Sequence, residues 1–413
     1  MASLLSSWTQ GKFRAFPQSL RSKRPKYARL YNDDDATDLG QLHMRTPAQR
    51  RTWLQRLCAT IFLIVIIAVF FATYYVFQPG DDRKANKSAA VHHHHSHSSE
   101  GGCRQLHVRR EWRTIDAEEK WSYIMAVKCL MAHPSQFMAG TSYYDDFIYA
   151  HSKTGVYSHY AAAFLPWHRM YVHLYEKALR EKCSYAGPFV YWDWTLDSAN
   201  LSLSPVWDPN AGFGSNGKAT PLLRNDDGDV RYCVKDGPFA DTTRPWKALS
   251  SGHSHDVTME PHCLSRHFTE PGDELLPTVH RLISPERVEK TLSQPDYEAF
   301  FADFEEGPHN AIPQFIKGGL FDVYGAECVK ETDYPVFWLH HTQVDRLWAL
   351  WQQRNPGKRL KEYGGPSSDF RHHHDEDGGS FMTDVLPMAG LADDDPVVED
   401  VMDTAGGLLC YRY

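Results

Sequence analysis

An uncharged apolar run near the N-terminus limits what the rest of the chain can fold into. Residues 57–78, LCATIFLIVIIAVFFATYYVFQ, are 22 residues without a charged side chain, long enough to cross a bilayer as a helix. The other interpretations are a buried core helix or a cleaved signal peptide, but 56 residues precede the run, too many for an ordinary signal peptide. We therefore predict a transmembrane signal-anchor helix.

The charges on either side of this run predict its orientation. Four arginines lie between positions 45 and 56, whereas Asp81 and Asp82 follow the run. Because basic residues are retained on the cytosolic side, we expect a single-pass type II membrane protein whose folded domain lies in the secretory-pathway lumen or outside the cell. Residues 1–56 then form a disordered cytosolic tail, and residues 79–102 form a stalk rich in His, Ser and Gly.

Cysteines and glycosylation sequons agree with an oxidising compartment. Cys58 lies in the apolar run, and seven cysteines follow it: Cys103, Cys129, Cys183, Cys233, Cys263, Cys328 and Cys410. Disulfides are expected there, and the odd number leaves one cysteine free. Asn86-Lys-Ser and Asn200-Leu-Ser match the acceptor pattern, so we predict N-glycosylation at Asn86 and Asn200.

Residues 103–413 are predicted to form one mainly helical domain. The segments EKWSYIMAVKCLM, HRMYVHLYEKALR and HTQVDRLWALWQQR repeat apolar residues at helical spacing, and Asp116 and Glu119 suit a capping box before the first. Gly-, Pro-, Asp- and Ser-rich stretches at 195–260 and 356–400 contain few alternating runs, which argues against a large sheet. A net charge of -8 and a pI near 6.3 exclude the basic surface typical of nucleic-acid binders.

Three histidines in the segment 151–168 are candidate metal ligands. Neutral imidazole is a common nitrogen ligand for copper, zinc and iron, and three of them can hold one metal ion. On one continuous helix His159 and His168 would lie on opposite sides, so we expect a break at Pro166, with His168 on a helix and His151 and His159 reaching it from other elements.

A second histidine-bearing segment, FWLHHTQVDRLW at 337–348, has a similar setting. It is rich in Trp and Phe, as is the FLPWHR segment around His168. Asp345 follows His341 by four residues, so on a helix its carboxylate could orient a neighbouring metal ligand. Two such helices predict a buried binuclear metal site.

Seven segments of the chain form a recognisable set: VRREW (108–112), YDDFIYAH (144–151), FLPWHRMYV (164–172), YWDW (191–194), GFGSNG (212–217), PHCLSRHF (261–268) and PVFWLHHTQVDRLWALWQ (335–352). Together they resemble the short, ascomycete-type fungal tyrosinases and catechol oxidases of the type 3 copper family. The resemblance covers about three quarters of the chain. It implies two copper ions, each held by three histidines on a four-helix bundle, that bind dioxygen between them.

The resemblance also implies roles for individual residues. His151, His159 and His168 would bind the first copper, and His309 and His341 the second. Phe337 corresponds to a ring that packs over the second copper's ligands. Asn310 matches a position that helps to activate a water molecule for phenol deprotonation. The disulfide pairs implied by the resemblance are Cys103–Cys410, Cys129–Cys183 and Cys233–Cys263, with Cys328 left over.

The segment GPHNAIP at 307–313 departs from the family pattern. Pro313 stands where the family's His-x-x-x-His pair would place the middle ligand of the second copper, and proline offers no donor nitrogen. One interpretation is that another histidine substitutes; the candidates are His262, His267, His280 and His340, of which His340 is expected to point away because it adjoins a ligand. A second is a copper held by two histidines and water. A third is a degenerate protein with one copper or none.

The chain departs from the family pattern at two further places. The family has Asn-Asp-Pro before FWLHH, whereas this chain has Asp333-Tyr334-Pro335, and no cysteine lies near His159 to form the thioether that some relatives carry.

Other prominent residues are interpreted as structural. Trp192 and Trp194 are expected in the core, Arg169 and Arg346 are expected to tie helices to carboxylates such as Asp193 or Asp345, and His173 is expected to face solvent or lie satisfied in the core. We assign no site to three sets in polar segments: the stalk histidines, the pair His253 and His255, and the cluster His372, His373 and His374.

The expected function is copper-dependent oxidation of a phenol, catechol or tyrosine-like substrate by dioxygen. The membrane anchor and the resemblance to fungal secondary-metabolism enzymes suggest a phenolic small molecule or a peptide tyrosine, processed in the secretory pathway. The alternative from another class is a tyrosinase-like scaffold with one copper or none that binds or assembles partners. Pro313 separates the two hypotheses.

Overall fold

Long helices carry the core of this computed structural model, which describes residues 103–224, 230–248, 257–318, 335–368 and 379–413. The predicted membrane helix, tail and stalk lie outside these residues. So do these individually predicted positions: Cys58, Asn86, His253, His255, Cys328, His372, His373 and His374. Within the described ranges, no helix is both long enough and apolar enough to span a membrane.

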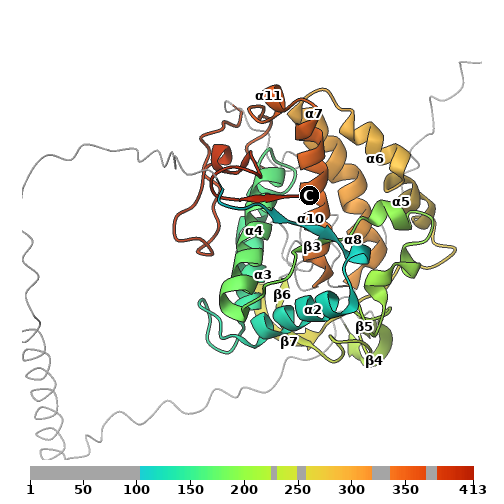
Figure 1. Ribbon diagram of the computed structural model, residues 1–413. Helices are drawn as coiled ribbons and strands as arrows, with labels where there is room; N and C mark the ends of the chain where they lie inside the picture. The colour runs from blue at the N-terminus through green and yellow to red at the C-terminus, as the bar shows by residue number, and fades with distance from the viewer. Residues whose placement is uncertain (1–102, 225–229, 249–256, 319–334, 369–378) are drawn as a thin grey trace, which may run out of the picture. The chain divides into compact units, whose positions relative to one another are not determined.

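Four helices of 16 to 20 residues form the largest part of the fold. They are α2 (Ala117–Ala132), α3 (Tyr143–Ser158), α4 (Phe164–Cys183) and α10 (Val336–Gln353). Helix α4 packs against each of the other three, and in Figure 1 α10 runs through the middle of the molecule. The prediction of a mainly helical domain is confirmed.

Shorter helices follow one another between these long ones. They are α5 (Leu276–Leu282), α6 (Pro285–Leu292), α7 (Tyr297–Phe304), the π-helical turn η5 (Glu305–His309), α8 (Asn310–Ile316) and α11 (Pro356–Arg359). Short 3-10 turns are η1 (Trp112–Thr114), η2 (Trp194–Asp197), η3 (Leu201–Leu203), η4 (Pro205–Trp207) and η7 (Val398–Val401).

Strands form only two-stranded ribbons in the described ranges. Two ribbons are parallel and join distant segments: β1 (His107–Val108) with β8 (Tyr411–Arg412), and β2 (Arg110–Glu111) with β3 (Val190–Tyr191). Two are antiparallel: β4 (Lys218–Arg224) with β5 (Val230–Cys233), and β6 (Thr243–Ala248) with β7 (Val257–Cys263). The absence of a large sheet agrees with the sequence prediction.

Local sequence signals fix the helix ends. The predicted capping box of α2 is present, since Asp116 accepts from the Glu119 backbone and the Glu119 side chain accepts from the Asp116 backbone. The break before His168 is not at Pro166, because α3 already ends at Ser158 and α4 starts at Phe164. Pro166 lies in the first turn of α4, where a missing backbone N–H leaves no hydrogen bond broken.

Aromatic side chains and buried ion pairs join the helices. Trp192 and Trp194 are fully buried, as predicted. Arg169 on α4 donates to Asp345 on α10, and Arg346 donates to Asp193 at 3.3 Å, so both arginines tie helices to carboxylates as predicted. Since buried charges are tolerated only when paired, these contacts fix the helices' relative positions.

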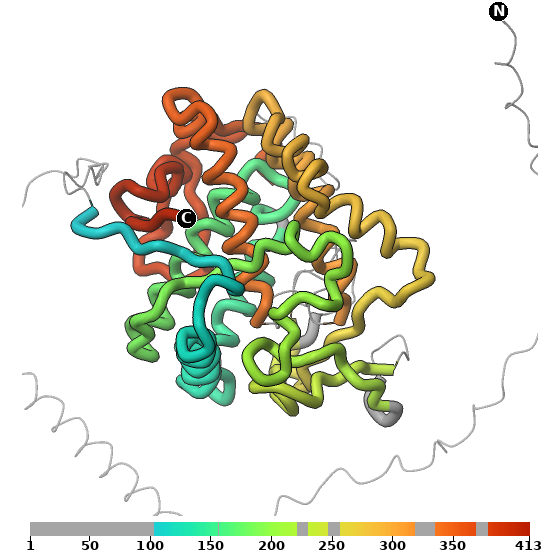
Figure 2. The backbone as a smooth tube through the Cα atoms, turned by 45° about the vertical axis from the view of Figure 1, so that its right-hand side comes forward, coloured from blue at the N-terminus to red at the C-terminus, as the bar shows by residue number. Residues whose placement is uncertain are grey.

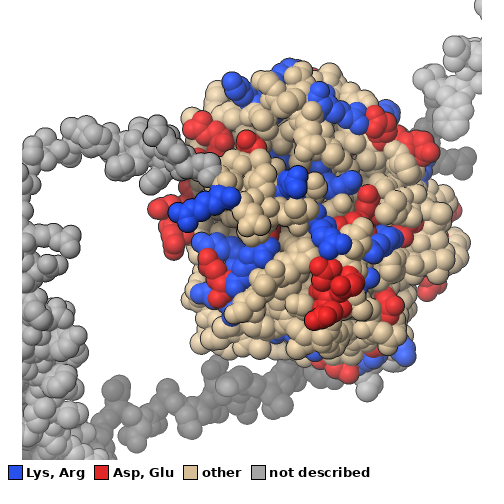
Figure 3. Space-filling model, viewed as in Figure 1, with Lys and Arg blue, Asp and Glu red and all other residues tan. Residues whose placement is uncertain are grey.

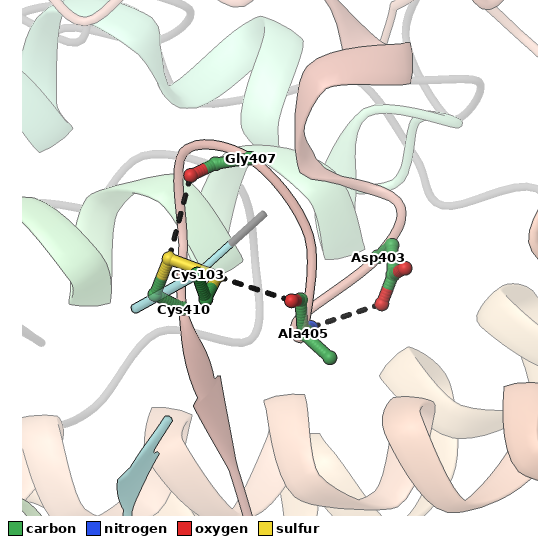
Figure 4. The surroundings of a disulfide bond; sticks show 5 residues. All are labelled: Cys103, Asp403, Ala405, Gly407 and Cys410. Atoms are coloured by element: carbon green, nitrogen blue, oxygen red, sulfur yellow. Dashed lines mark hydrogen bonds between the residues drawn. A yellow bond between two sulfur atoms is a disulfide. The ribbon is translucent and has the colours of Figure 1, made fainter. Parts of the chain in front are cut away.

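Three disulfides hold the described domain, and all have the predicted pairing: Cys103–Cys410, Cys129–Cys183 and Cys233–Cys263. The first joins the two ends of the domain, where the C-terminal segment runs beside the first residues described (Figures 1 and 2). In Figure 4, Cys103 Sγ lies 3.1 Å from the carbonyl oxygen of Ala405, in a loop that Asp403 stabilises by accepting from the Ala405 N–H at 2.9 Å.

The surface carries charges of both signs. On the face drawn in Figure 3, basic and acidic side chains are interspersed, with no extended field of one sign. Asn200 of the predicted glycosylation sequon is exposed, and its side-chain oxygen accepts from the Ser202 hydroxyl at 2.6 Å.

Candidate metal centre

The first predicted histidine set comes together where α3 ends and α4 begins. His151 lies on α3, His159 follows its last residue, and His168 lies on α4. One ligand-type nitrogen from each lies within 4.8 Å of the other two. All three side chains are buried, at 0%, 5% and 1% exposed. The break between the helices makes this possible, because the backbone reverses at Tyr160, whose φ is +52°.

Backbone contacts leave two of these histidines with an inward-facing lone pair. His168 Nδ1 lies 2.7 Å from the carbonyl oxygen of Phe164, and His159 Nδ1 lies 3.3 Å from that of Gly155. A carbonyl only accepts, so both Nδ1 atoms carry the proton and both Nε2 atoms are unprotonated. Neither Nε2 has a hydrogen-bond partner among the described residues. An orphaned buried acceptor of this kind is what a metal ion would satisfy.

The second set contains a residue that the sequence analysis placed elsewhere. His309, the last residue of η5, groups with both His340 and His341 of α10, again with one nitrogen each within 4.8 Å. The expectation that His340 points away is wrong. Its neighbours on α10 from Val336 to Asp345 are all buried, so this part of the helix has no solvent-facing side for His340 to occupy.

The other candidates for the missing ligand lie apart from this set. The His267 ring stacks on Tyr232 with centroids 3.7 Å apart and pairs with Glu270 at 3.5 Å. His262 contacts the Glu260 backbone, and His280 lies on α5, where it lines a surface pocket. None of the three groups with His309 and His341 in the described structure. His173 is partly buried on α4 and also lies outside both sets.

The two sets face each other as one site. The rings of His168 and His341 stack with centroids 4.3 Å apart and an interplanar angle of 14°. Phe337 packs against His341 at 4.2 Å, as predicted for the second set, and its ring also lies 5.6 Å from that of His151 in the first. We call the six histidines the histidine site.

Burial favours the neutral form of five of these six imidazoles. It is the largest cause that lowers the pKa of His159, His168, His340 and His341, with neighbouring histidines adding to the effect, and it lowers the pKa of His309 to about 4. Neutral imidazole is the form that coordinates metal ions. The donors therefore need no deprotonation at neutral pH.

A short hydrogen-bond chain supports His309. Asn310 Oδ1 lies 2.9 Å from His309 Nδ1, and Asn310 Nδ2 donates to the Tyr160 hydroxyl at 2.9 Å. The Tyr160 N–H donates to Glu305 Oε1 at 2.8 Å. Asn310 therefore fixes the tautomer that leaves His309 Nε2 unprotonated, and Tyr160 links the loop of the first set to the second. Tyr160 and Glu305 were missed in the sequence, where no spacing rule connects residues 145 positions apart.

Asp345 does not have the role that its spacing suggested. Its carboxylate accepts from Arg109 at 3.0 Å, from Arg169 and from the hydroxyls of Tyr411 and Tyr413. Asp345 is therefore a buried structural residue that joins α10 to segments at both ends of the domain. Burial alone would raise the pKa of Asp345, but Arg169 and Arg109 outweigh it and lower the value.

Nitrogen donors alone, buried and neutral, suit a borderline metal such as copper better than a hard ion such as magnesium or calcium. A third group within the described residues, Cys129, His133 and Cys183, offers no comparable site, since its two sulfurs are joined in a disulfide. The fold and the histidine site thus define a mainly helical protein equipped for a binuclear nitrogen-ligated metal centre.

The chain belongs to the tyrosinase family, whose members are type 3 copper proteins. Residues 141–354 match the model of the common central domain of tyrosinase, about half of the chain. Tyrosinase-like protein phomQ1 of Diaporthe leptostromiformis is 54% identical over 315 residues, which are 75% of this chain and 78% of that protein. Tyrosinase ustQ of Aspergillus flavus is 38% identical over 311 residues, 75% of this chain and 80% of that protein.

A solved structure gives the same fold. A point mutant of the polyphenol oxidase from Thermothelomyces thermophila superposes with a TM-score of 0.59 at 29% identity, covering 75% of this chain and 88% of that one.

Proposed function

We propose that this protein holds a pair of copper ions in the histidine site and uses dioxygen to oxidise a phenol or catechol. The observation that carries the proposal is the set of six buried imidazoles, arranged as two facing triads. Membership of the tyrosinase family and the fold shared with a polyphenol oxidase support copper as the metal and a phenol as the substrate class.

The reaction balances with dioxygen as the oxidant. Each catechol that becomes an ortho-quinone loses two electrons and two protons, and one dioxygen reduced to two waters accepts the electrons of two catechols. Paired Cu(I) ions, when bound, supply the electrons that start the reduction of dioxygen.

The chain's own residues prepare this chemistry. Burial keeps the imidazoles unprotonated, and the contacts to Phe164 and Asn310 fix the Nδ1-protonated form of His168 and His309. Phe337 packs against His341 of the second triad and near His151 of the first. The activation of a water molecule by Asn310 stays a prediction, and its side-chain oxygen also accepts from His309.

Pro313 no longer argues strongly for the alternative hypothesis of a tyrosinase-like scaffold with one copper or none. That hypothesis depended on Pro313, which removes an expected imidazole, but His340 brings a third imidazole to the second triad. The anchor at 57–78 and a lumenal location remain part of the proposal. The three disulfides support an oxidising compartment for the domain, and the substrate within it would be a phenolic small molecule or a peptide tyrosine.

Copper loading of the full chain in detergent tests the proposal. We expect two coppers per chain by mass spectrometry, and oxygen uptake when a catechol is added. The variant His168→Gln is expected to lose both the first copper and the uptake, whereas His173→Gln, on the same helix but outside the histidine site, keeps both. A wild-type chain that binds no copper, or binds two without oxidising mono- or diphenols, would overturn the proposed function.

A further inference from the structure

The segment formed by η5 and α8 supplies only one ligand-type side chain, His309, to the second triad. His309 immediately precedes α8, and a residue four positions later would lie on the same side of the helix. That residue is Pro313, which is buried and carries no nitrogen able to donate a lone pair. The second triad must therefore be completed from another element.

His340 has the chemistry and the position to complete it. Its ring stacks on His309 with centroids 5.1 Å apart and lies 5.0 Å from the His341 ring. Its side chain is 1% exposed, and neither ring nitrogen has a hydrogen-bond partner among the described residues.

A structural histidine in a protein core normally has hydrogen-bond partners for its ring nitrogens. A neutral imidazole has one donor and one acceptor nitrogen, and burying either without a partner is unfavourable. Buried polar groups without partners are rare in folded proteins, and each calls for a specific cause. A metal ion bound by one nitrogen of His340 provides that cause.

The spacing within the triad suits an ion. His309 Nε2 and His341 Nε2 lie 3.4 Å apart. Two metal–nitrogen bonds of about 2.0–2.1 Å that meet near the tetrahedral angle separate their nitrogens by about 3.4 Å. These two nitrogens are thus already spaced for a common ion, and His340 lies beside both.

We propose that His340 has replaced the ligand lost at Pro313, so that the second copper is held by His309, His340 and His341. The inference rests on the proposed function for the presence of copper, and it specifies how the second ion is bound. Two of the three ligands then come from consecutive residues of α10. The third, His309, is the only ligand from the segment formed by η5 and α8. The interpretations with two ligands and water, or with no second copper, are set aside.

The variant His340→Gln tests this inference through metal content. We expect the variant to retain the first copper and lose the second, giving about one copper per chain where the wild type has two. The remaining Cu(II), without a partner to couple to, should give the electron paramagnetic resonance signal of an isolated ion. His267→Gln is the matched control, because His267 was also a candidate by sequence and lies outside the histidine site; it should bind two coppers.

The outcomes separate this inference from the proposed function. If the wild type and His340→Gln both bind two coppers, the inference is overturned and the proposed function stands. If the wild type binds none, the proposed function itself fails.

A second measurement covers the case in which the variant does not fold. In crystals of the unchanged copper-loaded chain, anomalous diffraction at the copper edge locates each ion directly. A His340 nitrogen about 2.0–2.1 Å from the second ion supports the inference. A second ion with water in that position, and His340 beyond bonding distance, would contradict it.

Discussion

At the residue scale, a single hydrogen bond determines which ring nitrogen of His168 and of His309 is free to bind a metal ion. The Phe164 carbonyl sets the tautomer of His168, and the Asn310 side chain sets that of His309. Partners of this kind orient metal ligands and are worth about 10–100-fold in metal affinity. They also explain why Asn310 matters whether or not it activates a water molecule.

Replacing Asn310 should weaken the second metal position selectively. Asn310→Ala removes the acceptor for His309 Nδ1–H, so we expect the affinity for the second copper to fall about 10–100-fold while the first is unchanged. Competition with a Cu(I) chelator measures both steps. Tyr160→Phe is the control, because it removes the acceptor of Asn310 Nδ2 and leaves the contact between Asn310 and His309 in place. Equal loss at both copper positions would refute this role.

Acid should destabilise the metal-free protein before its carboxylates titrate. Burial lowers the pKa of His309 to about 4, from an ordinary value near 6.5. Between these values the unfolded chain binds the proton and the folded one does not, so stability falls as pH drops from about 6.5 to about 4. His309 alone contributes up to about 3 kcal/mol by this linkage.

Urea unfolding of the metal-free chain at pH 7 and pH 5 measures the effect. The difference in unfolding free energy between the two pH values should shrink in His309→Gln and persist in His267→Gln, whose ring lies outside the histidine site. An unchanged difference in His309→Gln would show that His309 titrates normally in the folded state.

At the scale of elements, the histidine site depends on α3, α4, η5 and α10 meeting at one place. The sequence pattern made His151, His159 and His168 candidate ligands, and the family resemblance implied His309 and His341. His340 was one of four candidates for the missing ligand but was expected to point away, because helical geometry separates adjacent residues by about 100° and suggests that only one of them faces a site. Because α10 is buried at every position from Val336 to Asp345, this geometric argument does not apply to His340.

The division of ligands between α8 and α10 can be reversed. In the double variant Pro313→His with His340→Gln, the His-x-x-x-His pattern returns to α8, and we expect the chain to bind two coppers again. The measurement is copper per chain, compared with His340→Gln alone at about one. A double variant that stays at one copper would mean that α8 cannot present a second ligand, even with histidine at 313.

At the scale of the whole molecule, contacts between segments far apart in the sequence could not be predicted from local patterns. The Cys103–Cys410 disulfide joins residues 307 positions apart, and the parallel ribbon of β1 and β8 runs beside it. Only the family resemblance suggested this cysteine pairing. The helical class could be predicted from apolar spacing. The contacts of Asp345 could not, because they come from segments at both ends of the domain.

The Cys103–Cys410 disulfide should stabilise the domain without shaping the histidine site. It closes the longest loop of the three disulfides, and cross-links of this kind typically contribute about 2–4 kcal/mol by restricting the unfolded chain. We expect the double variant Cys103→Ser with Cys410→Ser to lower the unfolding free energy by that amount and to retain two coppers per chain, because neither cysteine contacts any of the six histidines in the described structure. Loss of copper in a variant that remains folded would contradict this expectation. It would mean that the disulfide, by fixing the C-terminal segment whose Tyr411 and Tyr413 hydroxyls donate to Asp345, also holds α10 in position for its two ligands.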